Sequence, residues 1–441
     1  MRILQLFIRG LTGLTVLACS HTAPVFADQS TVPALPDPLT LEFALSRVDT
    51  EHPDMLRAQA DVDIARATEQ RAEADQGIQT TLEGRLRWVD PSSIAPTNQH
   101  DDNQISLLVR KKLYDFGKSD ASIASAKSSL KSQEWLYTSS RDQRRIDIMQ
   151  AFFNVIIADL LYARDNEAMA TAYVNWDRSR DRNKLGQISD IQLAEAEYHY
   201  QQARNVRYAS DVKRRVQRSA LANLLNVPGQ LPANLVTPKL PVIERKLPEV
   251  DTLMALARQQ NPRLQAIREE VEAAQQRLQA ARAGNKPVIQ AELEASEYSR
   301  DLGSRDPFRA GISIQVPLTT GGAVDAEIAQ QRAAWLKSQA NLRKTQMDIE
   351  QRVLELWQAI YVLNAGVEKS KVYSDYRDLY LDRSRGLYEL DVKADLGDAM
   401  VQFSDARYQT YKTMFDLALA WAKMDALIGH AEIPAAGDNN Q

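Results

Sequence analysis

The stretch FRAGISIQVPLTTGGAVDAEIAQQRA, residues 308–333, changes from one periodicity to another along its length. Residues 308–318 alternate apolar with polar side chains, which is the pattern of a β-strand with two different faces. After Gly321 and Gly322, glycine and proline are absent from residue 323 to residue 365. Because these two residue types are the strongest helix breakers, the run predicts a helix much longer than that of an ordinary globular domain. A strand therefore leads directly into a very long helix.

Three other stretches have the same alternation, namely 80–89, 103–113 and 288–296. Each is about as long as a tilted transmembrane strand, which takes roughly 9 to 11 residues. Together with 308–318 they form two pairs, and each pair predicts a β-hairpin between helical segments. The side opposite the apolar one carries charged and amide groups, which suits a water-filled lumen. Four amphipathic strands of a soluble sheet are the alternative interpretation.

The order of these elements occurs twice. Residues 51–67 match residues 260–276 at an offset of 209, and LYDFGK (113–118) matches LTTGGA (318–323) at an offset of 205. A second run free of glycine and proline, 118–185, would be roughly 100 Å long as one helix or as two stacked helices. Each half of the chain therefore predicts a helix, a hairpin, a very long helix and a further helix.

These observations divide the chain into five segments. They are a signal peptide (1–27), a first repeat (28–226), a proline-rich linker (227–250), a second repeat (251–429) and a C-terminal tail (430–441). Each chain then has four strands, whereas the smallest transmembrane barrels have about eight. An open sheet edge in lipid would leave backbone groups without hydrogen bonds. If the strands enter a membrane, several chains must share one barrel.

The first 27 residues have the features of a secretory signal. Arg2 and Arg9 precede an apolar segment, and small or apolar residues lead up to Ala27. The sequence VLAC, which ends at Cys19, also fits a lipoprotein signal whose cysteine would carry lipid. The two interpretations exclude each other, and we prefer cleavage after Ala27 because SHTAPVFA makes a good polar cleavage region. Cys19 is the only cysteine, so we expect no disulfide in the folded part.

The composition excludes some classes of function. The 441-residue chain has a formal net charge of −4 and a pI of about 5.9, so it has no overall basic field that would hold nucleic acid. Its five histidines are scattered, and it has no CxxC, HExxH or phosphate-binding loop motif. We expect His199 to be a helix-surface residue rather than a metal ligand. We predict no catalytic site, no metal and no cofactor.

This arrangement resembles that of the TolC-like outer-membrane efflux proteins, from about Leu39 to Gly429. No single motif is decisive, but the order of the motifs is specific because it occurs twice. The stretches that carry the resemblance are HPDMLRAQADVDIARA (52–67), NPRLQAIREEVEAAQ (261–275), LYDFGK (113–118), VPLTTGGAVDAEIAQQRA (316–333), LGQISDIQLAEAEYHYQQAR (185–204) and ELDVKADLGDAMVQFSDARYQT (389–410).

The resemblance implies a mainly α fold with a transmembrane β-barrel portion. Three copies of the chain would form a homotrimer, with a twelve-stranded barrel in outer-membrane lipid and a periplasmic α-helical barrel below it. The resemblance also implies a passive export duct of tripartite efflux or type I secretion. Its partners would be a periplasmic adaptor and an inner-membrane RND pump or ABC transporter. The alternative is a periplasmic coiled-coil scaffold or adaptor protein without a barrel, in which two matching hairpins are not expected.

In this family, an Asp-x-x-Asp-Ala motif in the turn between the last two helices rings the periplasmic entrance of the pore. Here the motif begins at Asp395 and its second aspartate is Asp398. The resemblance therefore assigns these two carboxylates to the pore entrance, and places Asp190 in the matching turn of the first repeat. The family also has a glycine before this motif, where this chain has Asp391.

The same aspartates also have a purely local interpretation. An aspartate at a helix N-terminus accepts hydrogen bonds from free N–H groups and suits the helix dipole, so residue type alone favours caps at Asp395 and Asp190. A second aspartate one turn further on adds like-charge repulsion and is not required for a cap. Asp398 is therefore the residue that we most expect to face the pore. Tyr388 and Lys393 are candidate latch residues that would hold the entrance closed.

Overall fold

A computed structural model describes residues 35–49, 52–240, 244–300, 302–303, 305–390 and 395–430. Cys19, Lys393, the expected signal peptide and the tail after residue 430 lie outside these ranges. The chain from Asp37 onward forms one structural unit.

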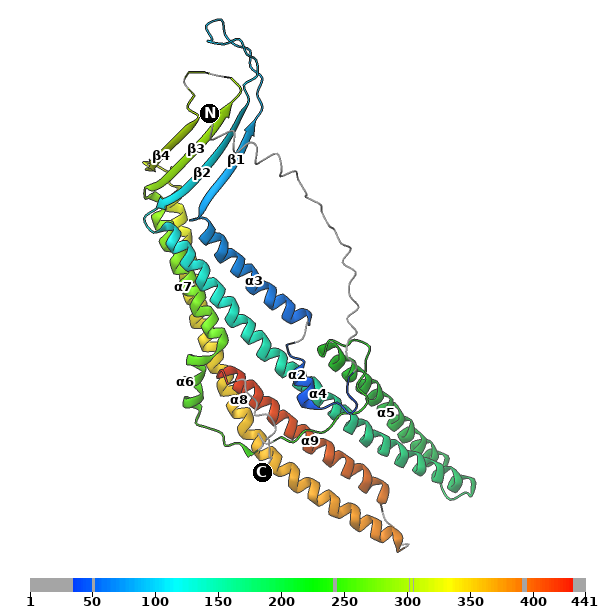
Figure 1. Ribbon diagram of the computed structural model, residues 1–441. Helices are drawn as coiled ribbons and strands as arrows, with labels where there is room; N and C mark the ends of the chain where they lie inside the picture. Colours follow the sequence, from blue (N-terminus) through cyan, green and yellow to red (C-terminus); the bar gives the residue numbers. More distant parts are fainter. Residues whose placement is uncertain are drawn as a thin grey trace, which may run out of the picture. The chain divides into compact units, whose positions relative to one another are not determined.

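The two repeats have the same elements in the same order (Figure 1). The first repeat contains α3 (Pro53–Ala74), β1 (Ile78–Arg85), β2 (Gln104–Tyr114), α4 (Lys118–Lys184) and α5 (Asp190–Leu224). The second contains α7 (Pro262–Arg282), β3 (Val288–Tyr298), β4 (Phe308–Gln315), α8 (Ala323–Glu389) and α9 (Leu396–Leu427). Short helices α2 (Leu41–Ser46) and α6 (Val250–Gln260) precede the repeats, and a 3-10 turn, η2 (Ala283–Asn285), follows α7.

The long helices are continuous. Both α4 and α8 have 67 residues, which corresponds to about 100 Å each. Each begins after a glycine in the left-handed conformation, Gly117 at φ 87° and Gly322 at φ 83°. Glycine adopts this conformation without the steric cost that other residues have. The chain can therefore turn sharply from a strand into a helix at the same point of both repeats.

The duplicated His-Pro and Asn-Pro pairs explain where α3 and α7 begin. The His52 side chain accepts a hydrogen bond from the Asp54 N–H (3.2 Å), and the Asn261 side chain accepts one from the Leu264 N–H (3.0 Å). A proline follows each cap at a position where its missing N–H has no helical partner in any case. The two repeats therefore start their first helix by the same local mechanism.

The four strands form one antiparallel sheet in the order β1-β2-β3-β4. Leu82 pairs with Leu107, and Leu293 pairs with Val109 on one side and Ala310 on the other. Within the described residues, β1 and β4 have a partner on one side only. The two hairpins predicted from sequence are therefore joined side by side, and both outer edges of the sheet are open.

The strand ends differ from the predicted ones. The first strand begins at Ile78 and ends at Arg85, so it stops before Trp88, which lies in the loop. Trp88 makes only an isolated bridge with Asp101 and stacks on His100. The last strand ends at Gln315, before Pro317, which has no N–H for a sheet hydrogen bond. Alternation therefore continues beyond the residues that pair.

The register separates the strand residues into two different faces. We define the apolar face as Thr80, Leu82, Gly84, Ile105, Leu107, Val109, Ala291, Leu293, Ala295, Phe308, Ala310, Ile312 and Ile314. We define the polar face as Gln79, Thr81, Glu83, Arg85, Gln104, Ser106, Leu108, Arg110, Gln290, Glu292, Glu294, Ser296, Arg309 and Ser313. On the polar face, Arg110 lies 3.3 Å from Glu292 and Arg309 lies 2.7 Å from Glu294. In the centre of the sheet, charged residues therefore lie on the polar face only. Lys111 and Glu297 lie on the other face, near its ends.

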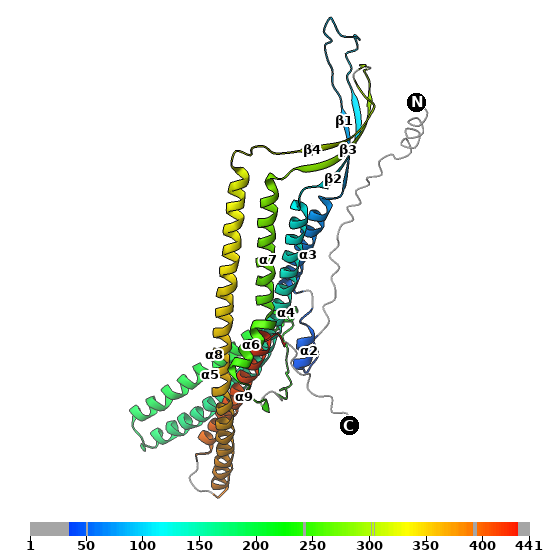
Figure 2. The same cartoon turned by 90° about the vertical axis from the view of Figure 1, so that its left-hand side faces the viewer.

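Packing between α4 and α9 joins the two repeats. The rings of Phe153 on α4 and Phe415 on α9 are stacked, with centroids 4.2 Å apart and planes 5° apart. Both side chains are buried, at 1% and 2% exposed. Helix α4 also packs on α3, α5 and α7, while α8 packs on α7 and α9 (Figure 2). By length and composition α4 alone among the described helices is apolar enough to cross a membrane, but half of that apolar segment is buried against the rest of the protein.

The inter-repeat linker is attached to the second repeat. Arg245 donates two hydrogen bonds to the Asp425 carboxylate (2.8 and 2.9 Å), and its guanidinium lies 4.1 Å from the centre of the Trp421 ring. Trp357 on α8 donates to the Pro248 carbonyl (2.9 Å). A cluster around Trp421 that includes Leu253, Leu264 and Ile360 lies beside these contacts. The linker therefore packs along α8 and α9 rather than separating two independent halves.

We expect Phe415→Ala to destabilise the protein by about 3 to 5 kcal/mol, because a buried ring is lost from the contact that joins the repeats. The thermal midpoint of the helical circular dichroism signal, measured at a fixed protein concentration, should fall. Tyr198→Ala is the matched control, because it removes a ring that is 63% exposed on α5. Equal midpoints for the two variants would contradict this role of the Phe153–Phe415 stack.

Candidate functional site

The candidate residues lie in two turns at the end of the helices that is far from the sheet (Figure 1). One turn joins α4 to α5, and the other joins α8 to α9. Both follow a 67-residue helix that starts at the sheet, so both lie about 100 Å from it. Any function of these turns is therefore separated from the sheet by the whole length of the helical part.

The turn of the first repeat is closed by its own hydrogen bonds. Gly186 is in the left-handed conformation and its N–H donates to the Asn183 carbonyl (2.9 Å), as in common helix C-caps. Ser189 caps α5 in a capping box, since its side chain accepts from the Gln192 N–H while the Gln192 side chain accepts from the Ser189 N–H. The expectation that Asp190 is the cap is wrong. Asp190 is the first helical residue, and its carboxylate accepts a hydrogen bond from the Asn183 side chain (3.0 Å).

Among the described residues at the start of α9, the N-cap residue makes no such hydrogen bond. Asp395 is at the N-cap position of α9, with φ −98° and ψ 61°, but its side chain makes no capping hydrogen bond. The expectation that Asp395 acts as a cap is therefore also wrong. Both Asp395 and Asp398 are exposed, whereas Ala399 beside them is fully buried. The two carboxylates thus share one turn and project from a helix end that packs through other residues.

The candidate residues do not all contact one another. Within the described ranges, no hydrogen bond or ion pair links Asp190 to Asp395 or Asp398. Tyr388 lies in the last turn of α8 and is 59% exposed. Lys393 falls in the turn that is not described. His199 lies on the exposed surface of α5, as expected.

Arg377 is a charged residue near Asp398 that the sequence analysis missed. Its guanidinium lies over three tyrosine rings of the same helix, at 5.2 Å from Tyr373, 5.0 Å from Tyr376 and 6.0 Å from Tyr380. The side-chain interaction with Tyr373 raises the pKa of Arg377, and the Asp398 carboxylate contributes a smaller rise. A spacing of three or four residues places side chains on one helix face. The spacing of Tyr373 and Tyr380 around Arg377 therefore predicts from sequence that the three side chains share one helix face.

The start of α9 packs closely on α4. A Cβ atom at Gly397 would lie 2.8 Å from the Thr171 methyl group, so only glycine allows this approach without a shift. Further along, Arg164 on α4 donates to Asp405 on α9 (3.0 Å) and to the neighbouring Asp165 (2.7 Å). Thr171 lies about 20 Å before the end of α4. The turn with the paired aspartates is thus held against the first repeat by packing and by charge.

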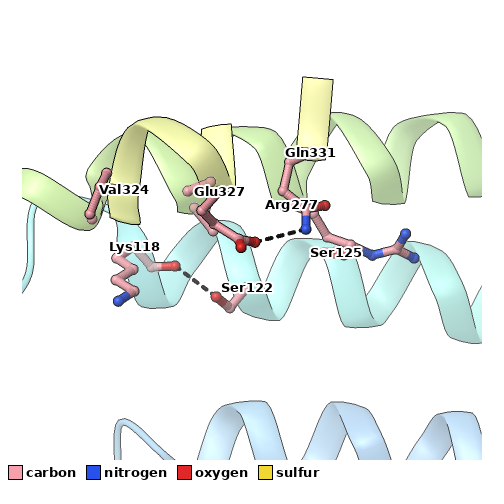
Figure 3. Close-up of a pocket in the computed structure, with 10 residues that line it drawn as sticks. Lys118, Ser122, Ser125, Arg277, Val324, Glu327 and Gln331 are labelled. Atoms are coloured by element: carbon pink, nitrogen blue, oxygen red, sulfur yellow. Dashed lines mark hydrogen bonds between the residues drawn. The ribbon is translucent and has the colours of Figure 1, made fainter. Parts of the chain in front are cut away.

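A pocket of about 480 Å³ lies near the first residues of α4 and α8, at the opposite end of these helices from the two turns, and Figure 3 shows residues that line it. Its lining comes from α4, α7, η2 and α8 and mixes charges with small side chains. Gln331 donates a hydrogen bond to Glu327 (2.8 Å), and the Ser122 hydroxyl donates to the Lys118 carbonyl (3.0 Å). The pocket is remote from both end turns, so it is no part of the site that they form.

Two hairpins joined in one sheet, and long helices that end in two turns far from it, are the features that we compared with known proteins. Residues 253–430, in the second repeat, match the family model described as outer membrane efflux protein. No curated protein matches the chain.

Solved outer-membrane channels have the same fold over nearly the whole chain. The CmeC outer membrane channel of Campylobacter jejuni is 13% identical, with a TM-score of 0.75 over 89% of this chain and 86% of that one. The outer membrane protein VceC of Vibrio cholerae is 16% identical, with a TM-score of 0.70 over 89% and 97% of the two chains. The open state of the MtrE outer membrane channel of Neisseria gonorrhoeae is 18% identical, with a TM-score of 0.65 over 89% of each chain.

These matches confirm the predicted resemblance to TolC-like outer-membrane efflux proteins and the predicted fold class. The family model covers only the second repeat, while the structural matches extend the fold to the first. The family description agrees with the predicted outer-membrane localisation and with a role in efflux.

The capping difference between the turns gives a direct test of the local interpretation. We expect Ser189→Ala to speed hydrogen–deuterium exchange at the start of α5 about five-fold, because a lost N-cap costs about 1 kcal/mol. Asp395→Ala should leave exchange at the start of α9 unchanged, because the Asp395 side chain makes no capping bond. Faster exchange at the start of α9 in Asp395→Ala would restore the cap interpretation.

Proposed function

We propose that this chain is the outer-membrane duct of a tripartite efflux or type I secretion system. In this proposal, substrates pass from the periplasm or from an inner-membrane transporter to the exterior through a passive channel. The observation that carries it is the sheet. Its register collects apolar side chains on one face and charged or amide side chains on the other, with both outer edges open.

The two faces suit the two environments of a barrel wall. The apolar face contains Leu82, Leu107, Leu293 and Ile312, and these side chains are exposed in a single chain. In a barrel they would contact lipid, while the ion pairs of the polar face would line water. The edges of β1 and β4 need partners in lipid, where no water satisfies backbone N–H and carbonyl groups.

Joining the β4 edge of one chain to the β1 edge of the next provides those partners. Four strands are too few to close a barrel, and two chains would supply about the minimum of eight. We propose three chains and twelve strands, because the fold is that of the TolC-like proteins. The helices of the three chains would then enclose a periplasmic duct about 100 Å long.

The periplasmic entrance of this duct is proposed to lie at the α8–α9 turn. Three copies would bring six carboxylates, from Asp395 and Asp398, into one narrow ring. Such a ring favours cations over anions and binds multivalent cations. Asp190, which is held by Asn183, would lie in the neighbouring turn. Tyr388 and Lys393 keep their assignment as candidate latch residues, and Arg377 joins them because of its interaction with Asp398.

The partners follow from the architecture of the proposed duct. A passive duct has no energy source of its own, so an inner-membrane RND pump or ABC transporter would drive export. A periplasmic adaptor would connect that transporter to the end turns. The competing interpretation, a periplasmic scaffold or adaptor without a barrel, has no use for an exposed sheet with one apolar and one charged face.

Reconstitution tests the proposal as a whole. The purified protein, added to a planar lipid bilayer, should give discrete conductance steps, and its mass in detergent should be that of three chains. A monomeric mass together with no conductance, under conditions that open the entrance, would favour the scaffold.

A pair of neighbouring substitutions tests the assignment of the faces. We expect Ile312→Arg to cost about 2 to 4 kcal/mol and to prevent assembly in the outer membrane, because it places a charge against lipid. Ser313→Arg, the next residue on β4 and on the opposite face, should assemble normally and reduce cation preference. Detergent-extracted trimer is measured for both. The reverse pattern would show that the lumen lies on the other side of the sheet.

The entrance assignment is tested by removing the charges. We expect the double variant Asp395→Asn, Asp398→Asn to lose cation preference and to be blocked less by trivalent cations, since the carboxylate ring is neutralised. Asp348→Asn is the control, because it removes an exposed carboxylate about 60 Å back along α8. Reversal potentials in a salt gradient give the preference. Unchanged values in the double variant would mean that these residues do not line the entrance.

A further inference from the structure

The loops beyond the strand ends contain a buried carboxylate. Loop 86–103 connects β1 to β2, and loop 299–307 connects β3 to β4. Loop residues of this kind are normally exposed, yet Asp102 is only 3% exposed. A buried carboxylate requires partners of opposite charge or several hydrogen bonds. Its partners therefore show what holds this part of the molecule together.

Asp102 binds two arginines that belong to different hairpins. Arg305, in the loop between β3 and β4, donates to one oxygen of the carboxylate (2.6 Å). Arg87, which follows β1, donates to the other oxygen through Nε (2.7 Å) and through Nη2. The Asp102 N–H also donates to the Arg87 carbonyl (2.8 Å). One carboxylate thus connects residues more than 200 positions apart in the sequence.

Further hydrogen bonds join the same two loops. Arg300 donates to the Thr97 carbonyl (3.0 Å), which lies near the middle of the longer loop. The Ser299 hydroxyl donates to the Asp101 carbonyl (3.0 Å) and accepts from the Asn103 N–H (2.8 Å). These bonds place both loops against each other on several sides of Asp102. The loops therefore form one folded unit, which we call the loop unit (86–103 with Ser299, Arg300 and Arg305).

We propose that Asp102 is a clamp that fixes the shape of the outer opening of the duct by holding the loop unit together. The orientation of the loops toward the exterior rests on the proposed function. In this arrangement the outer opening keeps one shape while changes in conductance arise at the far end, where Asp395 at the start of α9 makes no capping hydrogen bond. Charge-assisted hydrogen bonds of this kind are about twice as strong as neutral ones, which suits them to such a fixed structure.

The clamp is also resistant to acid. The hydrogen bonds from Arg305 and then from Arg87 lower the pKa of Asp102 from 3.8 to about 2, against the opposing effect of burial. These two guanidinium groups are the charges that act on Asp102. A carboxylate whose pKa is lowered by folding contributes its stabilisation above its unfolded pKa, and loses it only as the pH falls through the folded value. The loop unit should therefore remain intact at pH 5.

Hydrogen–deuterium exchange of the purified protein in detergent tests the clamp. We expect Asp102→Asn to speed exchange in peptides that cover 86–103 by about ten-fold or more, because charge-assisted bonds are lost. Peptides from α4 and α8 should be unchanged, which shows that the variant is folded. Asp101→Asn is the matched control, because this neighbouring carboxylate is exposed and makes no hydrogen bond or ion pair to described residues. Equal exchange in the two variants would overturn the proposal.

Two additional measurements sharpen the test. Arg305→Gln should also speed exchange, and the double variant Asp102→Asn, Arg305→Gln should be no faster than Asp102→Asn alone, because loss of the carboxylate already breaks the Arg305 contact. Additive effects would contradict a shared clamp. For the unaltered protein, exchange corrected for its intrinsic pH dependence should be the same at pH 7 and pH 5, and loss of protection at pH 5 would also count against it.

Conductance measurements test whether Asp102 fixes the shape of the outer opening. In a planar bilayer, Asp102→Asn should give excess noise in the open-channel current, and Asp101→Asn should not. Quiet current in Asp102→Asn, together with fast loop exchange, would show that the loop unit does not shape the opening. If the unaltered protein gives no conductance at all, the proposed duct fails, whereas the exchange experiment still decides whether Asp102 joins the loops.

Discussion

The packing of α4 on α7 and α9 is the contact on which the helical part depends, because it joins the two repeats, and the stacked rings of Phe153 and Phe415 lie within it. Repeats that only followed one another in sequence would leave the apolar faces of both long helices exposed. Instead α4 packs on helices of its own repeat and of the other, and the Arg164–Asp405 pair continues the contact toward the end turns. The linker adds to this by binding α9 through Asp425. A single-chain unit thus holds two hairpins in one sheet.

The long helices of the two repeats have the same length, but the helices that follow them begin differently. The first-repeat turn is closed by Ser189 and Asn183, and α5 packs only on α4 among its larger contacts. The second-repeat helix α9 is buried mainly between Phe415 and Asp425, and its N-cap residue makes no side-chain cap. The start of α5 is therefore stabilised by its own capping bonds, while the start of α9 packs on α4 through Gly397 and Thr171.

Local signals explain which parts of this fold could be predicted from sequence. Long runs without glycine or proline and alternating strands are visible residue by residue, and they predict the four strands, α4 and the first part of α8. Helix α8 continues through Gly366 and Gly386 to Glu389, because tertiary packing outweighs the helix-breaking tendency of glycine there. Alternation continues to Trp88, however, and only the folded loop shows that pairing stops at Arg85. The capping box of Ser189 and Gln192 was present in the sequence but was passed over in favour of Asp190. The proximity of Arg377 to Asp398, and of Asp102 to Arg305, depends on tertiary structure, so sequence spacing alone could not supply it.

The equal length of α4 and α8 has an evolutionary consequence. Inserting one residue in an α-helix advances its end by 1.5 Å and rotates everything beyond by about 100°. An insertion near the start of α4 alone would rotate the rest of α4 relative to α9 and would break the contacts between them. An insertion near the start of α8 alone would likewise rotate the rest of α8 relative to α9. Insertions and deletions should therefore be tolerated only when both helices change together and by nearly whole turns. Although α4 and α8 are encoded by different parts of one gene, selection therefore acts on their lengths together.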